Sequence, residues 1–176
     1  HGFQIVNKED GHPVRAGSQS IRFEVRQGDC GKDSDGGWSD CKNDRERHEL
    51  SGGDSEMTKG EHWFSWSIYF PKDHQNLYPL SNAFGQFHQK DGNPVFMFKE
   101  LRKGYTIVRT ITDSDLDYHE QNLISNDEAL GNWFDILINA KWSKKEDGFF
   151  KIWVNGDLRY DYKGPTKSKS KVYQKF

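Results

Sequence analysis

Residues 62–70 read HWFSWSIYF, an alternation of side chains that is typical of a β-strand. The two faces of this predicted strand carry Phe64, Trp66, Ile68 and Phe70 on one side, and Trp63, Ser65, Ser67 and Tyr69 on the other. Aromatic rings lie on both faces, and such rings suit half-buried strands better than helices. The stretch therefore predicts a protein built from β-strands.

The composition agrees with that prediction. Hydrophobic residues make up 33% of the 176 residues and aromatic residues 14%, so the core depends on Phe, Trp and Tyr. A chain of this length suits one domain, residues 1–176.

Short strands separated by turns follow along the whole chain. Further strands are predicted at residues 3–6, 20–26, 44–50, 83–90, 95–98, 105–111, 133–142, 149–154, 157–162 and 172–176. A turn is expected at residues 91–94, and Asn155-Gly156 predicts a type I′ hairpin. Residues 113–132 are expected to be irregular, with a short helix near 126–130, and residues 167–171 to form a solvated linker. We therefore predict an all-β jelly-roll sandwich of two antiparallel sheets.

Two cysteines, Cys30 and Cys41, flank a loop rich in Gly and Asp. A bridge that closes so short a loop contributes on the order of 3 kcal/mol in the chain-entropy model. We predict a disulfide and an exported protein, secreted or periplasmic, with two free thiols as the alternative. No histidines stand at zinc-ligand spacing from these cysteines, which disfavours a zinc site.

The formal charge of -2 and the pI near 6.4 argue against a general nucleic-acid or membrane-surface binder. No apolar run approaches the roughly 20 residues that span a bilayer, and the sequence opens with no signal-peptide pattern. Any anionic ligand must therefore be met by local groups.

Two predicted strands carry polar side chains of complementary chemistry. Strand alternation puts Gln86 and His88 on one face of residues 83–90, and Arg45, Arg47 and Glu49 on one face of residues 44–50. An amide and a guanidinium can bind a carboxylate, and a neutral imidazole can accept a proton. These are the groups that β-elimination of a uronic-acid polymer requires. Two alternatives stay open: His88 as an ordinary structural residue, and the charged residues of 44–50 as surface ion pairs.

The ordered set of residues 45–50, 66–71 and 86–89 resembles the polysaccharide lyase family that includes glucuronan lyase and is itself similar to heparin lyase I. The resemblance covers about residues 13–176. Arg47-x-Glu49 and Gln86-x-His88 also resemble motifs of jelly-roll alginate lyases. The resemblance implies a concanavalin-like jelly roll whose concave sheet forms the substrate cleft, and cleavage of an anionic polysaccharide to an unsaturated product.

The resemblance also implies roles for individual residues. Gln86 would help to neutralise the substrate carboxylate, and His88 would be the candidate base. Arg45, Arg47 and Glu49 would bind substrate. His48 is a second candidate for the base, although a regular strand would aim His48 and Arg47 to opposite faces unless a bulge intervenes.

The final family motif is represented only by its beginning, residues 173–176. In the family a lysine, here Lys175, is followed four residues later by a tyrosine thought to act as acid or acid/base, and this position lies beyond residue 176. Lys175 is expected to bind substrate, whereas Tyr173 does not fit that spacing and is not assigned. The chain is expected to lack its C-terminal strand and to expose an unpaired sheet edge.

Two other functions compete with a lyase. A carbohydrate-binding module on the same sandwich would use Trp63, Tyr69 or Trp142 as stacking platforms. A glycoside hydrolase would need two suitably spaced carboxylates; Asp44 and Glu46 share strand parity, but no further acidic run completes the set.

We expect no essential metal or cofactor. A structural calcium ion is compatible with such sandwiches, although no Asp-x-Asp-x-Asp-Gly run is present. The expected partner is an anionic polysaccharide such as glucuronan, alginate or heparin, rather than nucleic acid or a membrane, and the protein is expected to be a monomer.

Overall fold

The computed structural model describes residues 2–31, 36–52, 59–112 and 117–176. The chain folds as two compact units, His1–Leu50 and Ser51–Phe176, and each is described by itself. The expectation of a single domain stays a prediction. None of the described helices is long and apolar enough to cross a membrane.

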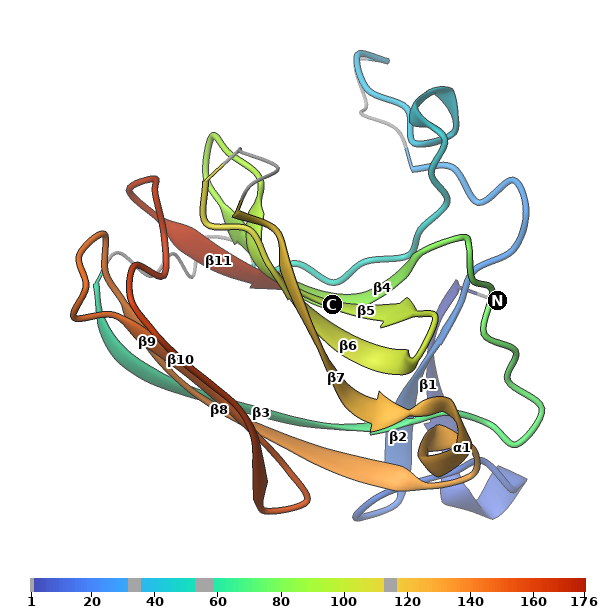
Figure 1. The fold of residues 1–176 in the computed structure, drawn as a ribbon. Coiled ribbons are helices and arrows are strands. Elements are labelled where there is room, and N and C mark those ends of the chain that lie inside the picture. The colour runs from blue at the N-terminus through green and yellow to red at the C-terminus, as the bar shows by residue number, and fades with distance from the viewer. Residues whose placement is uncertain (1, 32–35, 53–58, 113–116) are drawn as a thin grey trace. The chain divides into compact units, whose positions relative to one another are not determined.

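The second unit is built from two antiparallel sheets, which form separate layers in Figure 1. The four-stranded sheet has the order β10 (Asp157–Lys163), β9 (Phe149–Val154), β8 (Trp133–Trp142) and β3 (Gly60–Tyr69). The five-stranded sheet has the order β11 (Val172–Lys175), β4 (Asn82–Gln89), β5 (Pro94–Leu101), β6 (Gly104–Arg109) and β7 (His119–Ser125). The predicted all-β sandwich of two antiparallel sheets is confirmed.

Aromatic side chains from both sheets meet in one core. The rings of Phe96 on β5 and Phe150 on β9 stack with their centroids 3.8 Å apart. Trp66 on β3 meets Phe98 on β5 edge to face at 5.0 Å. One face of each sheet is thereby buried, and the side chains that alternate with these rings point away from the core.

The Asn155-Gly156 turn has the predicted form. Both residues have positive φ, 51° and 88°, as a type I′ turn requires, and Val154 pairs directly with Asp157. The short helix α1 (Asn126–Ala129) also lies where it was expected, and it begins with a capping box between Ser125 and Glu128.

Strand β7 (His119–Ser125) is the main element that the sequence pattern did not predict. Leu123 and Ile124 are both buried, so the run carries a short apolar end behind the polar residues 119–122 rather than a clean alternation. Part of the stretch predicted as irregular, residues 113–116, lies outside the described residues.

The expected solvated linker at residues 167–171 is wrong in part. Lys167 is only 6% exposed, and its Nζ donates to the carbonyl of Ser170. The backbone N–H groups of Ser168 and Lys169 both donate to the buried Oε1 of Gln89, at 2.7 Å each. A buried glutamine on β4 therefore fixes a segment that its composition marks as solvent-exposed.

The first unit contains a two-stranded ribbon, β1 (Gly2–Asn7) and β2 (Gln19–Glu24), with short 3-10 helices at Lys8–Asp10 and Cys41–Asn43. The predicted disulfide between Cys30 and Cys41 is present, with Cα atoms 5.2 Å apart.

The predicted strand at residues 44–50 does not form. Its backbone is tied to loops instead: the N–H of Arg45 donates to the carbonyl of Asp40, and that of Arg47 to the carbonyl of Asp29. The carboxylate of Glu46 accepts from the N–H of Gly28. These contacts satisfy donors that a sheet ladder would otherwise use. The parity argument that set His48 opposite Arg47 therefore does not apply.

Candidate functional site

Strand β4 places Gln86 and His88 together on the face of the five-stranded sheet turned away from the core. Both are half-buried, whereas Phe87 and Gln89, which alternate with them, are fully buried. The burial of Phe87 fixes the register, since a one-residue slip would send its ring outward and both polar groups into the core.

Strand β11 brings two further polar side chains beside this pair. Tyr173 pairs directly with His88, and Lys175 with Gln86, in the antiparallel ladder. The rings of Tyr173 and His88 stack with centroids 5.2 Å apart and planes 29° apart. The Nζ of Lys175 lies 5.7 Å from the centre of the Tyr173 ring. An amide, an imidazole, a phenol and an ammonium group thus occupy one small area, which we call the His88 cluster.

The hydrogen bond of His88 determines which ring nitrogen is basic. Its Nδ1 lies 2.7 Å from the carbonyl oxygen of Gln89. A carbonyl can only accept, so Nδ1 carries the hydrogen in the neutral ring and Nε2 carries the lone pair. Nε2 is therefore the nitrogen of His88 that can take a proton.

The same face continues onto β5 with side chains that the sequence analysis did not select. Met97 pairs with Gln86, and Lys99 lies two residues further along the same face. Both are half-buried and alternate with the buried Phe96 and Phe98. The alternation continues past residue 98, where the predicted strand ended, and extending that strand would have found Lys99. Tyr173 was considered and not assigned, although its i, i+2 spacing places it on the same strand face as Lys175.

Comparison with known proteins places this chain in a family. A model of the polysaccharide lyase family matches residues 6–176. The chain belongs to the polysaccharide lyase family. The crystal structure of endo-beta-1,4-glucuronan lyase from the fungus Trichoderma reesei is similar to this chain, with a TM-score of 0.68. The sequences are 16% identical, and the match covers 98% of this chain and 72% of that chain, so the likeness shows the fold. A search of curated proteins found no match.

The lyase resemblance also assigned substrate binding to Arg45, Arg47 and Glu49, which lie in the first unit, His1–Leu50. Arg47 forms a two-pronged ion pair with Asp40: its Nε donates to Oδ2 and its Nη2 to Oδ1, both at 2.8 Å. Its Nη1 lies 3.5 Å from Glu49. The guanidinium of Arg45 lies over the Trp38 ring, 5.8 Å from its centre. The roles of Arg45, Arg47 and Glu49 in binding substrate stay predictions.

His48 is held differently from His88. Its Nε2 lies 3.0 Å from Oδ2 of Asp29. An ionised carboxylate only accepts, so in the neutral ring Nε2 carries the hydrogen and Nδ1 the lone pair. His48 therefore remains a second candidate for the base.

Asp40, which binds Arg47, and Asp29, which binds His48, both have a pKa below the ordinary value of an aspartate. Burial alone would raise the pKa of Asp40, but hydrogen bonds from Arg47 and Trp38 and the guanidinium charges outweigh it and lower that pKa. The pKa of Asp29 is lowered, first by the backbone N–H of Arg26; burial opposes this, and the hydrogen bond and charge of the His48 ring and the charge of Arg26 lower the pKa further. Both carboxylates stay ionised at neutral pH.

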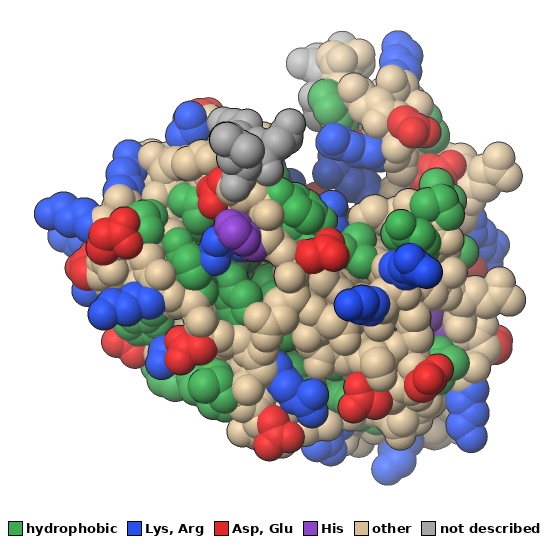
Figure 2. Space-filling model, viewed as in Figure 1, with side chains coloured by type: hydrophobic (Ala, Val, Ile, Leu, Met, Phe, Trp, Pro, Cys, Tyr) green, Lys and Arg blue, Asp and Glu red, His purple; other side chains and the backbone are tan. Residues whose placement is uncertain are grey.

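No group of three or more His, Cys, Asp or Glu in the described ranges is arranged to hold a metal ion. The expectation of no essential metal or cofactor stays a prediction. Figure 2 shows Lys and Arg side chains interspersed with Asp and Glu over the visible face, so recognition of an anion falls to local groups.

Proposed function

We propose that this protein cleaves a uronic-acid-containing polysaccharide by β-elimination, with the His88 cluster as the reacting site. The observation that carries the proposal is the orientation of His88, whose Nδ1 bonds to the Gln89 carbonyl and leaves Nε2 as the basic nitrogen. Family membership and the fold agree with a lyase. The polymer and the reaction are our proposal.

The first task of such a site is to weaken the C5–H bond of the uronate. A uronate carboxylate spreads negative charge as the C5 proton leaves, and an amide or ammonium group beside it stabilises that charge. Gln86 and Lys175 are adjacent across the β4–β11 ladder, so they can contact one carboxylate together. We assign them the neutralisation of this carboxylate.

The elimination then removes one proton from C5 and supplies one proton to O4. His88 Nε2 takes the C5 proton, and the C5–H electron pair forms the C4–C5 double bond. The C4–O4 bond breaks, and O4 takes a proton as the leaving sugar departs. Tyr173 lies against His88, and its hydroxyl is the donor that we assign to O4.

Arg47 and Arg45 are assigned a supporting role. Arg47 already forms a charged pair with Asp40, so its guanidinium would bind a substrate carboxylate only by dividing its hydrogen bonds between Asp40 and the substrate. We propose that Arg45 and Arg47 aid capture of an anionic chain, while Gln86 and Lys175 bind the carboxylate of the reacting sugar.

The product distinguishes a lyase from a binding module. Elimination leaves a 4,5-unsaturated uronate that absorbs in the ultraviolet, whereas hydrolysis or binding creates no such chromophore. The experiment mixes the 176-residue protein separately with glucuronan, alginate and heparin and follows absorbance with time, with mass spectrometry of the products. We expect absorbance to rise on one polymer. Binding without any unsaturated product on all three would overturn the proposal and leave a carbohydrate-binding module.

We also propose that the protein works outside the cytoplasm, in a secreted or periplasmic setting. The Cys30–Cys41 disulfide and a polysaccharide substrate both favour an oxidising, extracellular location.

A further inference from the structure

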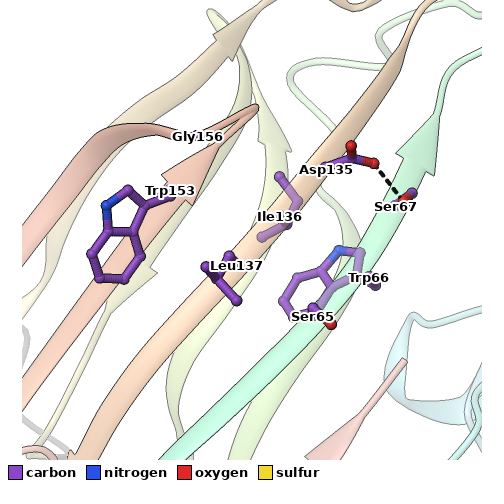
Figure 3. Close-up of a pocket in the computed structure, with 8 residues that line it drawn as sticks. All are labelled: Ser65, Trp66, Ser67, Asp135, Ile136, Leu137, Trp153 and Gly156. Carbon is purple, nitrogen blue, oxygen red and sulfur yellow. Dashed lines mark hydrogen bonds between the residues drawn. The ribbon is translucent and has the colours of Figure 1, made fainter.

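A hollow lies on the side of the sandwich opposite the His88 cluster, on the face of the four-stranded sheet turned away from the core. Its volume is about 460 Å³, and it is lined by residues of β3, β8 and β9 and by Gly156. Figure 3 shows the Trp153 ring, the Leu137 side chain and the Ser67–Asp135 pair across these three strands.

Two tryptophans lie on this face. Trp63 on β3 and Trp153 on β9 flank β8, and strands two apart in a sheet are separated by roughly 9.5 Å. Their ring centroids are nevertheless only 5.9 Å apart, with planes 22° apart, so the rings lean toward each other over β8. Trp63 remains 58% exposed, whereas Trp142 is 1% exposed in the core. Trp142 is therefore excluded as a stacking platform, and Trp63 is not.

Polar groups stand beside these rings. The hydroxyl of Ser67 donates to Oδ1 of Asp135 at 2.7 Å, and the exposed Ser65 lines the same hollow. An apolar floor with a few hydroxyl and carboxylate groups at its edge suits a sugar ring, whose C–H face packs on an indole while its hydroxyls form hydrogen bonds.

We infer that this surface, formed by Trp63, Trp153, Leu137, Ser65, Ser67 and Asp135, binds an uncharged polysaccharide chain at a site separate from the His88 cluster. We call it the tryptophan surface. Its role does not depend on the proposed lyase reaction.

Charge selects the uncharged chain over a polyuronate. Among the described residues that line the hollow there is one carboxylate, Asp135, and no lysine or arginine. Two lysines on the adjoining part of the face are paired: Lys141 with Asp147 at 2.8 Å and Lys151 with Asp161 at 3.3 Å. A uronate placed in the hollow would face Asp135 without a dedicated cation, and like charges at close range oppose binding.

The test is native gel electrophoresis in gels that contain either a soluble uncharged β-glucan or polyglucuronate. We expect the β-glucan to retard the wild type, and Trp63→Ala and Trp153→Ala each to weaken that retardation about tenfold. Tyr118→Ala removes an exposed aromatic just before β7, a strand of the other sheet, and is the matched control; it should bind as the wild type does.

Two further measurements make the outcome decisive. Circular dichroism and the thermal midpoint show whether each variant folds. If Trp153→Ala does not fold, Trp63→Ala alone tests the inference, because Trp63 is the more exposed ring. His88→Ala should keep β-glucan binding even if it abolishes lyase activity. Absence of retardation by the β-glucan, retardation by polyglucuronate alone, or unchanged binding in folded Trp63→Ala would each overturn the inference.

Discussion

The outward faces of the two sheets both arise from strand alternation, but they carry different kinds of side chain. On the five-stranded sheet, Gln86, His88, Tyr173 and Lys175 bring proton-transfer groups and a cation together. On the four-stranded sheet, Trp63 and Trp153 provide apolar rings beside a hollow whose described lining holds one carboxylate, Asp135. The inward faces of both sheets are alike, since aromatic rings fill the space between them.

The contrast shows how an antiparallel sandwich separates stability from function. Every second residue of each strand builds the shared core, and the residues between them are free to differ from one sheet to the other. We expect changes on one outward face to leave the other unaffected, and changes in the core to damage both. The predictions below test that separation, from the largest effect to the smallest.

His88→Ala should lower kcat on the cleaved polyuronate by about 10²- to 10⁴-fold, because a positioned general base contributes that much. Binding of uncharged β-glucan should stay unchanged. His119→Ala, which removes an exposed histidine from β7 of the same sheet, is the matched control. His48→Ala should be measured alongside; if it is inactive while His88→Ala retains normal kcat, the base is His48.

Phe96→Ala should lower the free energy of unfolding by about 3–5 kcal/mol, since it leaves a cavity where two rings stack at 3.8 Å. Both polyuronate cleavage and β-glucan binding should then fall together in thermal or denaturant titrations. Leu80→Ala, which alters a side chain that is 69% exposed, should be nearly neutral. Loss of only one activity in Phe96→Ala would show that the two faces do not depend on a common core.

Tyr173→Phe should lower kcat by roughly 10²-fold, at the lower end of what general acid catalysis contributes, because it removes the hydroxyl and keeps the ring. If Tyr173 only supports the His88 ring by stacking, the Phe variant should be fully active and Tyr173→Ala impaired. Comparing kcat and the pH profile of the two variants separates these roles.

Lys175→Ala should raise KM for the polyuronate about fivefold, since one partly exposed charge pair contributes up to about 1 kcal/mol. The salt dependence of KM should weaken as well. Lys163→Ala, on the exposed end of β10 in the other sheet, is the control for charge. An unchanged KM in Lys175→Ala would remove this lysine from substrate binding.

The smallest effect is expected at Asp147, after the end of β8. Hydrogen bonds from Lys141 and Ser143 lower the pKa of Asp147 to about 2. A carboxylate whose pKa is lower in the folded state stabilises the fold above its unfolded pKa, about 3.9, and loses that effect as pH falls through about 2. Asp147→Asn should therefore be slightly less stable than the wild type at pH 5, and the difference should vanish only below pH 2. A constant difference in the free energy of unfolding across this range would contradict the shift.

The sequence predicted most of the sheets, because buried rings at every second position mark strands clearly. Residues 62–70, 83–90 and 149–154 are examples, and in each of them one set of alternate rings, such as Trp66, Phe87 and Phe150, packs in the core. Strand β7 was missed because its polar residues come first and Leu123 and Ile124 are consecutive. Residues 44–50 alternate as a strand would, but ion pairs and loop hydrogen bonds hold them in another conformation.

The candidate site was predictable only in part. Alternation within β4 was enough to place Gln86 beside His88. The pairing of Tyr173 with His88 depends on which strand lies next to β4, and local patterns carry no information about such partners. Lys167 was misjudged for the same reason, since its burial depends on the distant Gln89 that anchors Ser168 and Lys169.

The pairing of β4 with β11 also determines when, during folding, the protein can first bind its ligands. Gln89 and Ser168, which lie at the start of that pairing, are 79 residues apart in the sequence. Ser67 and Asp135, at the tryptophan surface, are separated by 68. Hairpins such as β9–β10 close early because their loops are short, whereas these distant pairs must pay a larger loop-closure entropy. Neither surface exists in a partly folded chain that has formed only its local hairpins. Onset of ligand binding during refolding would therefore report completion of the sandwich rather than its beginning.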